Sequence, residues 1–122
     1  MDRDISILQH ILMYCDQIGK SIERFGDSCE IFENDVDYHN SICMDMLQIG
    51  ELVGRLSDNF IKKNQQKIPW KQIRSLRNMC AHDYLNVTYS IIFEIAHTGV
   101  IELKEFCEAQ IAKNEDNNEA AH

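Results

Sequence analysis

The sequence predicts an all-α protein. Helix breakers are scarce, with one proline and five glycines among 122 residues, and apolar residues recur at helical spacing over long stretches. The length suits one domain with a single core. We place this domain at residues 1–113 and expect residues 114–122, which are polar and acidic, to be disordered.

The first half of the chain predicts two long helices. Apolar residues keep a helical period from Ile5 to Phe25, and the pair Gly26 and Asp27 ends the run. Residues 28–36 are expected to form a short helical turn or a loop. A second long helix is predicted at about residues 37–56, where Gly50 would let another backbone approach closely. Its core stripe is expected to be Ile42, Met46, Ile49 and Val53.

The second half predicts two further helices after a polar, irregular segment at residues 57–68. Pro69 fits the first turn of the third helix, because its missing N–H costs nothing there. Its buried face is expected to be Ile73, Leu76 and Cys80. Asn86 or Thr88 can cap the fourth helix, which should run to about Ala112. Its inward residues are expected to be Ile92, Ile95, Leu103 and Phe106.

A polar motif lies near the end of the third predicted helix and contains Arg77, Asn78, His82 and Tyr84. At about 100° per residue, the pairs Arg77/Tyr84 and Asn78/His82 form two neighbouring stripes. An arginine is always charged and can hold a phosphate, and a histidine with a reference pKa of roughly 6.5 can exchange a proton near neutrality. These side chains suit RNA cleavage without a metal. The alternative is that they are ordinary solvated surface residues.

The charge is unevenly distributed along the chain. The formal net charge is −8, yet residues 55–77 hold seven basic residues and one acidic residue, a local net of +6. A basic segment leading into the motif suits an RNA-binding groove, although a solvated helix face is the alternative. The candidate RNA-binding residues are Lys62, Lys63, Lys67, Lys71 and Arg74.

Other site classes find little support in the sequence. The five cysteines include no C-x-x-C pair, and the histidines show no metal-binding spacing, so we expect no metal and no cofactor. A catalytic thiol at Cys80 is not expected, because only His82 could activate it and that residue lies on a different face. No apolar run approaches the roughly 20 residues that span a bilayer, and the N-terminus is acidic. We expect a soluble, cytoplasmic protein without membrane contact.

Several short runs resemble the HepT-like toxins of the HEPN superfamily, and the similarity extends over most of the chain. These runs are Leu47-Gln48-Ile49-Gly50-Glu51, Ile68-Pro69-Trp70, Leu76-Arg77-Asn78 and Ala81-His82-Asp83-Tyr84. The resemblance implies an up-and-down, HEPN-like bundle of four to five helices. It also implies a dimer, in which the motifs of two protomers line one cleft.

The resemblance further implies a metal-independent endoribonuclease that acts as the toxin of a type VII-like toxin–antitoxin pair. On this basis Arg77 and His82 are the catalytic pair, and Asn78 positions them or the phosphate. The antitoxin would be a minimal nucleotidyltransferase that silences the toxin by transferring AMP to Tyr84. Two alternatives stay open: a binding module that grips RNA or a nucleotide-bearing partner without catalysis, and a structural partner subunit that has lost activity.

Overall fold

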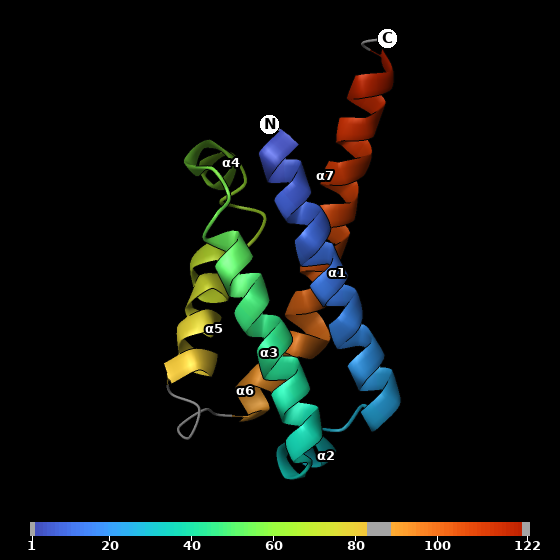
Figure 1. Ribbon diagram of the computed structural model, residues 1–122, viewed down its shortest axis with the longest axis vertical. Coiled ribbons are helices and arrows are strands. Elements are labelled where there is room, and N and C mark those ends of the chain that lie inside the picture. The colour runs from blue at the N-terminus through green and yellow to red at the C-terminus, as the bar shows by residue number, and fades with distance from the viewer. Residues whose placement is uncertain (1, 83–88, 121–122) are drawn as a thin grey trace.

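Long helices that alternate in direction make up the computed structural model (Figure 1). The structure describes residues 2–82 and 89–120, and the side chains of residues 3–80 and 89–119. Within these ranges there is no strand. The prediction of an all-α, up-and-down bundle is therefore confirmed.

The first two long helices lie where the sequence predicts them. Helix α1 (Asp2–Phe25) ends at Gly26, whose φ of +116° is a left-handed conformation that favours glycine. A short helix, α2 (Cys29–Asn34), follows in the segment for which a helical turn was an option. Helix α3 (Val36–Val53) begins after Asp35, whose carboxylate accepts a hydrogen bond from the backbone N–H of Tyr38 at 3.1 Å.

The prediction of an irregular segment at residues 57–68 is wrong in part, because α4 (Asp58–Lys63) forms there. Ser57 caps this helix by accepting from the N–H of Phe60 at 3.2 Å. The carboxylate of Asp4 in α1 accepts from the Ser57 N–H and hydroxyl at 2.9 and 2.6 Å. The N-cap Ser57 and its contact with Asp4 on α1 thus support a helix in a segment whose polar composition suggests an irregular structure.

Helix α5 (Trp70–His82) carries Arg77, Asn78 and His82 of the motif. Pro69 lies just before it, and its carbonyl accepts from the N–H of Ile73 at 3.1 Å, so the proline is the N-cap rather than part of the first turn. The indole N–H of Trp70 donates to the carbonyl of Asn64 at 3.2 Å. This bond fixes the start of α5 against the turn that precedes it.

The fourth predicted helix is a continuous run of three elements: α6 (Tyr89–Glu94), a π-helix η2 (Ile95–Gly99) and α7 (Val100–Ala120). Its proposed caps, Asn86 and Thr88, lie outside the described residues. The expected disorder of residues 114–122 differs from the structure as far as Ala120, where α7 is still helical. Adding a residue to an existing helix is far easier than nucleating one, so α7 can extend beyond the core.

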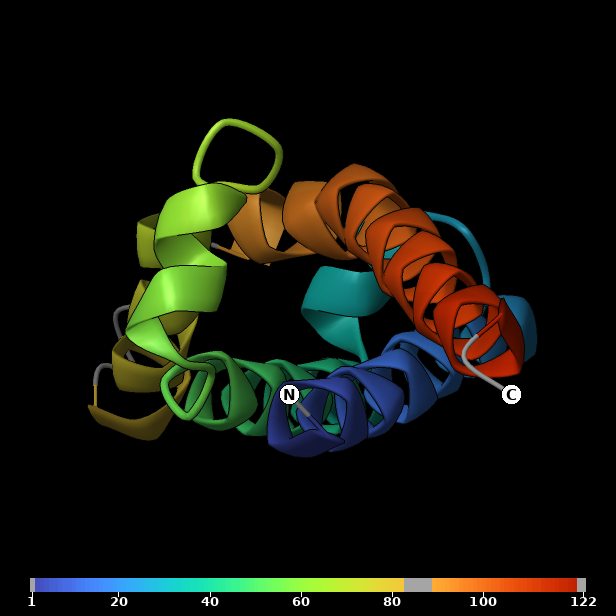
Figure 2. The same cartoon turned by 90° about the horizontal axis from the view of Figure 1, so that it is seen from above.

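Helix α3 lies between α1 and α5, and α7 packs against the other side of α1 (Figure 2). Every predicted core residue of α3 is buried, and so are Leu76, Cys80, Ile92 and Leu103. Ile73, Ile95 and Phe106 are half-buried against the same core. Among the described residues, each helix is either too short or too polar to cross a membrane.

Candidate functional site

The candidate site lies where α3 and α5 pack closely, at Gly50. A Cβ atom at this glycine would lie 2.7 Å from the Cβ of Arg77 and 3.1 Å from its backbone nitrogen. Any side chain at position 50 would therefore push α5 away from α3. The predicted close approach at Gly50 is confirmed, and the approaching backbone is that of the motif arginine.

Arg77 is held by two neighbouring side chains. Its Nε donates to the carboxylate of Glu51 on α3, and its Nη1 donates to Oδ1 of Asn78 at 3.0 Å. The Arg77 side chain is 41% exposed and that of Glu51 36%, so solvent and ligands can reach the pair. A guanidinium has five N–H donors. Most of them therefore remain for an anion, in an orientation that Glu51 and Asn78 fix.

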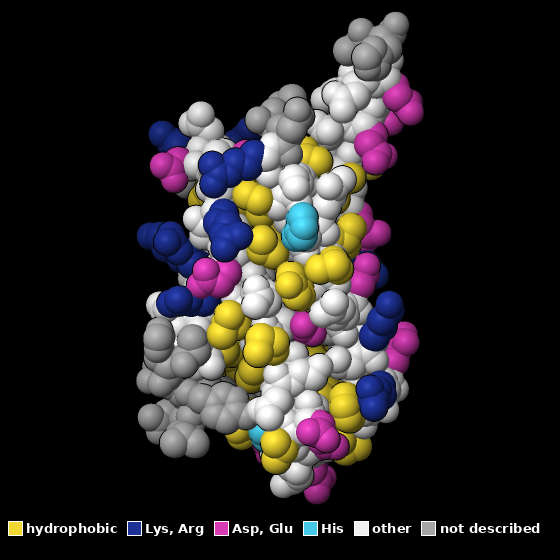
Figure 3. Space-filling view, in the orientation of Figure 1, with side chains coloured by type: hydrophobic (Ala, Val, Ile, Leu, Met, Phe, Trp, Pro, Cys, Tyr) yellow, Lys and Arg dark blue, Asp and Glu magenta, His cyan; other side chains and the backbone are white. Residues whose placement is uncertain are grey.

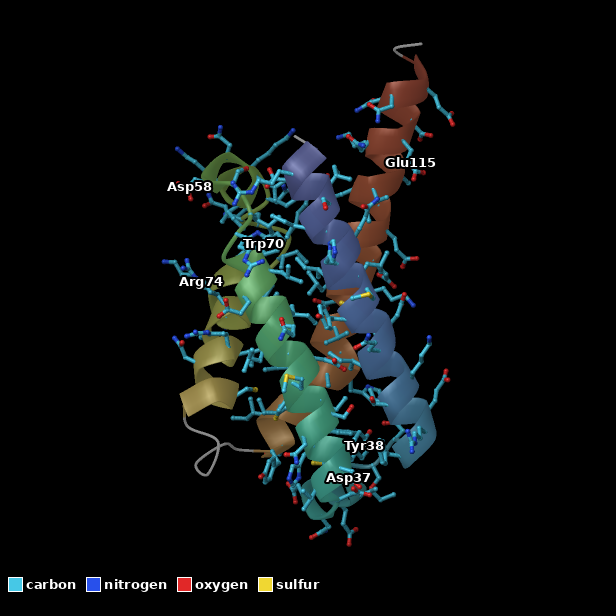
Figure 4. All side chains as sticks on the ribbon, in the orientation of Figure 1. Asp37, Tyr38, Asp58, Trp70, Arg74 and Glu115 are labelled. Atoms are coloured by element: carbon cyan, nitrogen blue, oxygen red, sulfur yellow. The ribbon has the colours of Figure 1, made fainter. Side chains whose placement is uncertain are left out.

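A polar hollow of about 270 Å³ opens around Arg77, and we call it the arginine hollow. It is lined by Gly50, Glu51, Gly54, Arg55, Arg74, Arg77 and Asn78. The Arg74 guanidinium lies over Gly54, with its Nε 3.4 Å from the position of a Cβ there. Figure 4 labels Arg74 near the start of α5, at the level of the last turn of α3. Three guanidinium groups against one carboxylate make this hollow attractive to an anion.

Three of the five predicted basic residues line one of two separate hollows, and the other two line neither. Arg74 joins the arginine hollow, whereas Lys63 and Lys67 line a separate hollow near α7. Lys62 and Lys71 are exposed and line neither hollow. Figure 3 shows Lys and Arg side chains gathered over α4, α5 and the end of α3, whereas Asp and Glu side chains follow α7. The uneven charge of the sequence is thus also uneven in space.

The remaining motif residues lie at the edge of the described structure. The backbone of α5 is helical through His82, which places residues 78 and 82 one turn apart, as predicted. The side chain of His82 and the whole of Tyr84 lie outside the described residues. Their proposed roles as catalyst and AMP acceptor therefore remain predictions.

Cys80 lies in the motif helix and is not suited to nucleophilic catalysis. A hydrogen bond with Cys43 of α3, together with burial, raises its pKa well above the usual range, so the thiol stays protonated. Within the described ranges, no group of three or more His, Cys, Asp or Glu side chains could hold a metal ion.

The site contains two residues that the sequence interpretation did not assign to it, Glu51 and Arg55. A signal for both was present in the spacing. Gly50 lies in α3 and Gly54 directly follows its end, four residues later. Glu51 and Arg55 directly follow the two glycines with the same spacing. Where one helix packs closely against a second helix, the side chains next to the contact lie beside the backbone of the second helix.

Two curated proteins resemble this chain over most of their length. One is a "Putative RNase" of Caldanaerobacter subterraneus subsp. tengcongensis, 33% identical over 98 residues, which cover 80% of this chain and 85% of that protein. Another is a "Putative RNase" of Methanocaldococcus jannaschii, 27% identical over 92 residues, which cover 69% of this chain and 84% of that protein. No solved structure matches the chain well enough to count as similar.

The match to a protein family covers the whole of the arginine hollow. The model of the family described as "Ribonuclease HepT-like" matches residues 11–110. That range includes Gly50, Glu51, Gly54 and all residues of the motif. With the family match spanning most of the chain, and with the resemblance of the motif, this protein belongs to the HepT-like ribonuclease family.

Proposed function

We propose that this protein is a metal-independent endoribonuclease and the toxin of a type VII-like toxin–antitoxin pair. The observation that carries the proposal is Arg77, held by Glu51 and Asn78 at the centre of a cation-lined hollow in a chain of a ribonuclease family. The names of the two relatives support nuclease activity. The phosphate of an RNA strand is the substrate group that such a hollow suits.

In the proposed reaction, His82 removes the proton of a ribose 2′-hydroxyl, and the resulting oxygen attacks the adjacent phosphorus. The bond to the 5′-oxygen breaks, this oxygen takes up a proton, and a 2′,3′-cyclic phosphate remains. Acid–base assistance of this kind typically contributes about 10² to 10⁴ in rate. Arg77 stabilises the negative charge that grows on the phosphoryl oxygens, and its fixed orientation means that little reorganisation is needed.

The reaction needs both a general acid and a general base, and one protomer offers a single histidine in the motif. We therefore propose a homodimer whose two motif helices lie near the two-fold axis, where the second protomer supplies the remaining donor. Two arginine hollows would then face each other, which is costly unless an anion lies between them. Added phosphate or sulfate should raise the melting temperature. A monomer by light scattering at micromolar concentration would contradict the composite site.

We propose that a minimal nucleotidyltransferase antitoxin inhibits the enzyme by AMP transfer to Tyr84. The added group is bulky and anionic, so beside Arg77 it would exclude the substrate phosphate by sterics and by charge. Tyr84→Phe should stay toxic and become insensitive to the antitoxin, and the wild-type protein should gain mass in AMP steps. If intact-mass spectrometry shows no adduct, the antitoxin works by covering the site instead.

The decisive experiment is RNA cleavage by purified, unmodified protein. Arg77→Ala and His82→Ala should each lower cleavage by at least about 10² and remove toxicity, with unchanged circular dichroism. Arg24→Ala serves as the matched control, because Arg24 is exposed at the end of α1 and lines neither the arginine hollow nor the hollow near α7. Cleavage that persists in either motif variant refutes the mechanism. RNA binding without any cleavage by the wild type favours the non-catalytic binding module.

Chelation tests the proposed independence from metal. Cleavage should continue in excess EDTA and leave cyclic phosphate ends, because the histidine and the arginine supply proton transfer and charge stabilisation without a metal. Loss of activity that magnesium restores would show that a metal takes part in the reaction.

A further inference from the structure

A second polar hollow, of about 180 Å³, lies where α4 and the turn that follows it face α1 and α7. We call it the lysine hollow. Its cationic side chains are Lys63, Lys67 and Lys113, and its amides include Gln110, Asn114 and Asn117. Lys63 and Lys67 were predicted to bind RNA, whereas the four residues from α7 were assigned no function. We propose that this hollow binds a phosphodiester group and the attached nucleotide of the RNA strand, away from the cleavage site.

The charge of the lysine hollow is not neutralised by its surroundings. Asp4 is its one acidic lining residue, and both carboxylate oxygens of Asp4 already accept hydrogen bonds from Ser57. Across the described part of the chain, the ion pairs of lysine and arginine join Arg77 to Glu51 and Lys104 to Asp16. The three lysines of the hollow are in neither pair, so their ammonium groups are available to an anion.

The backbone that presents these side chains is well fixed on both sides. On α7, residues 110, 113, 114 and 117 follow the spacing i, i+3, i+4, i+7, which places them on one helix face. On the other side, the carbonyl of the buried Asn64 accepts from the Lys67 N–H at 3.0 Å and from the Trp70 indole at 3.2 Å. One wall of the hollow is thus a face of the regular helix α7, and the other is a turn that hydrogen bonds to Asn64 hold in place.

RNA is the ligand that this arrangement favours. Lys63 and Lys67 belong to the same basic segment as Arg74 and Arg77 in the arginine hollow, and Figure 3 shows Lys and Arg side chains over α4 and α5. Amide side chains can both donate to and accept from base edges and 2′-hydroxyl groups. Outside the hollow, α7 exposes Glu108, Glu115, Asp116 and Glu119. Figure 4 shows Glu115 at the edge of α7 that is turned away from α4. Glu108 and Glu119 lie on the same helix face as Glu115, because they are seven and four residues from it, so these three carboxylates lie opposite the face that lines the hollow.

The inference rests on the proposed nuclease function, and binding can test it separately. The probe is a long, fluorescein-labelled, single-stranded 2′-O-methyl RNA, which keeps its phosphates but cannot react by 2′-hydroxyl attack. By fluorescence anisotropy, Lys113→Ala should weaken binding about threefold to tenfold and reduce the slope of log K against log salt by about 0.7, the loss of one phosphate contact. Lys20→Ala, which removes an equally exposed lysine from α1, should change neither quantity.

Cleavage of two substrates separates this hollow from the reaction. Lys113→Ala should lower kcat/KM on the long, unmodified RNA and leave it unchanged on a dinucleotide, which has a single phosphodiester. If Lys113→Ala and Lys20→Ala bind the long RNA with the same affinity and the same salt dependence, the proposal is overturned. Equal loss on both substrates also overturns it. If the wild type cuts no RNA but Lys113→Ala still weakens binding, the nuclease function fails and the lysine hollow stands.

Discussion

The arginine hollow and the lysine hollow both take charges from the basic segment at residues 55–77, yet they hold them differently. In the arginine hollow, Arg77 is oriented by Glu51 on a neighbouring helix and by Asn78 beside it. In the lysine hollow, Lys63 and Lys113 are exposed and lie outside the ion pairs of the described chain. The guanidinium of Arg77 in the arginine hollow therefore has a fixed orientation, whereas the ammonium groups in the lysine hollow are carried by flexible side chains.

This difference separates chemistry from affinity. A transition state is stabilised by donors that already point to where charge develops, so a fixed guanidinium acts mainly on kcat. Flexible lysines bind a polyanion mainly by releasing counterions, so they act on Kd and on its salt dependence. Removing a positive charge from the arginine hollow should thus mainly lower kcat, whereas removing one from the lysine hollow should mainly raise Kd.

Charge-conserving exchanges should show the largest contrast. Arg77→Lys keeps the charge but loses the planar donors that reach Glu51 and Asn78, so kcat should fall by about 10² to 10³. Lys67→Arg in the lysine hollow should leave kcat within about twofold, because its contact needs only a positive charge. Single-turnover cleavage measures both variants. Similar losses in the two variants would mean that the hollows do not differ in this way.

The packing beneath the arginine hollow can be broken at one glycine. Gly50→Ala should lower the free energy of unfolding by about 1–3 kcal/mol, because its methyl group would overlap with Arg77. Gly19→Ala is the matched control, since a Cβ there meets nothing within 4 Å, and it should raise stability by up to about 1 kcal/mol. Urea unfolding measures both variants. Equal effects would show that α3 and α5 are not in close contact at Gly50.

Glu51 offers a subtler way to release Arg77. Glu51→Gln keeps the size of the side chain but removes the charge that holds the guanidinium, so kcat should fall by about tenfold. KM for RNA should stay equal or fall, because a negative charge has left a site for an anion. Steady-state kinetics separates the two parameters. A rise in KM with unchanged kcat would assign Glu51 to RNA binding instead.

The smallest expected effect is that of ending the chain after Lys113. This removes Asn114 and Asn117 from the lysine hollow and leaves the arginine hollow intact. RNA affinity should fall about twofold to threefold, since each exposed hydrogen bond contributes roughly 0.5 kcal/mol. Stability should change by less than about 0.5 kcal/mol, because residues 115–119 are exposed. A large loss of stability would extend the folded domain beyond the predicted boundary at residue 113.

The helical period predicted the long helices, and the spacing of Gly50 predicted where two of them meet. Such local signals could not reveal that Glu51 holds Arg77, because the two residues are 26 positions apart and meet only through packing. The same holds for the contact that anchors α4 to α1, because Asp4 lies 53 residues before its partner Ser57. Asn114 and Asn117 were missed for a similar reason: residues 114–122 were expected to be disordered, whereas α7 continues as a helix to Ala120 and brings both amides to the lysine hollow.

The π-helix at Ile95–Gly99 determines the rotational phase of everything that follows it. It accommodates an additional residue within an otherwise regular helix, and the hydroxyl of Thr98 donates to the Glu94 carbonyl at 2.8 Å across its start. If these five residues formed regular α-helix with none removed, α7 would turn by about 100° about its axis. Leu103 would leave the core, and Lys113 would leave the lysine hollow. Deleting one residue at the π-helix should by contrast be tolerated, because it removes the additional residue, closes the turn into regular α-helix and leaves the phase of α7 unchanged.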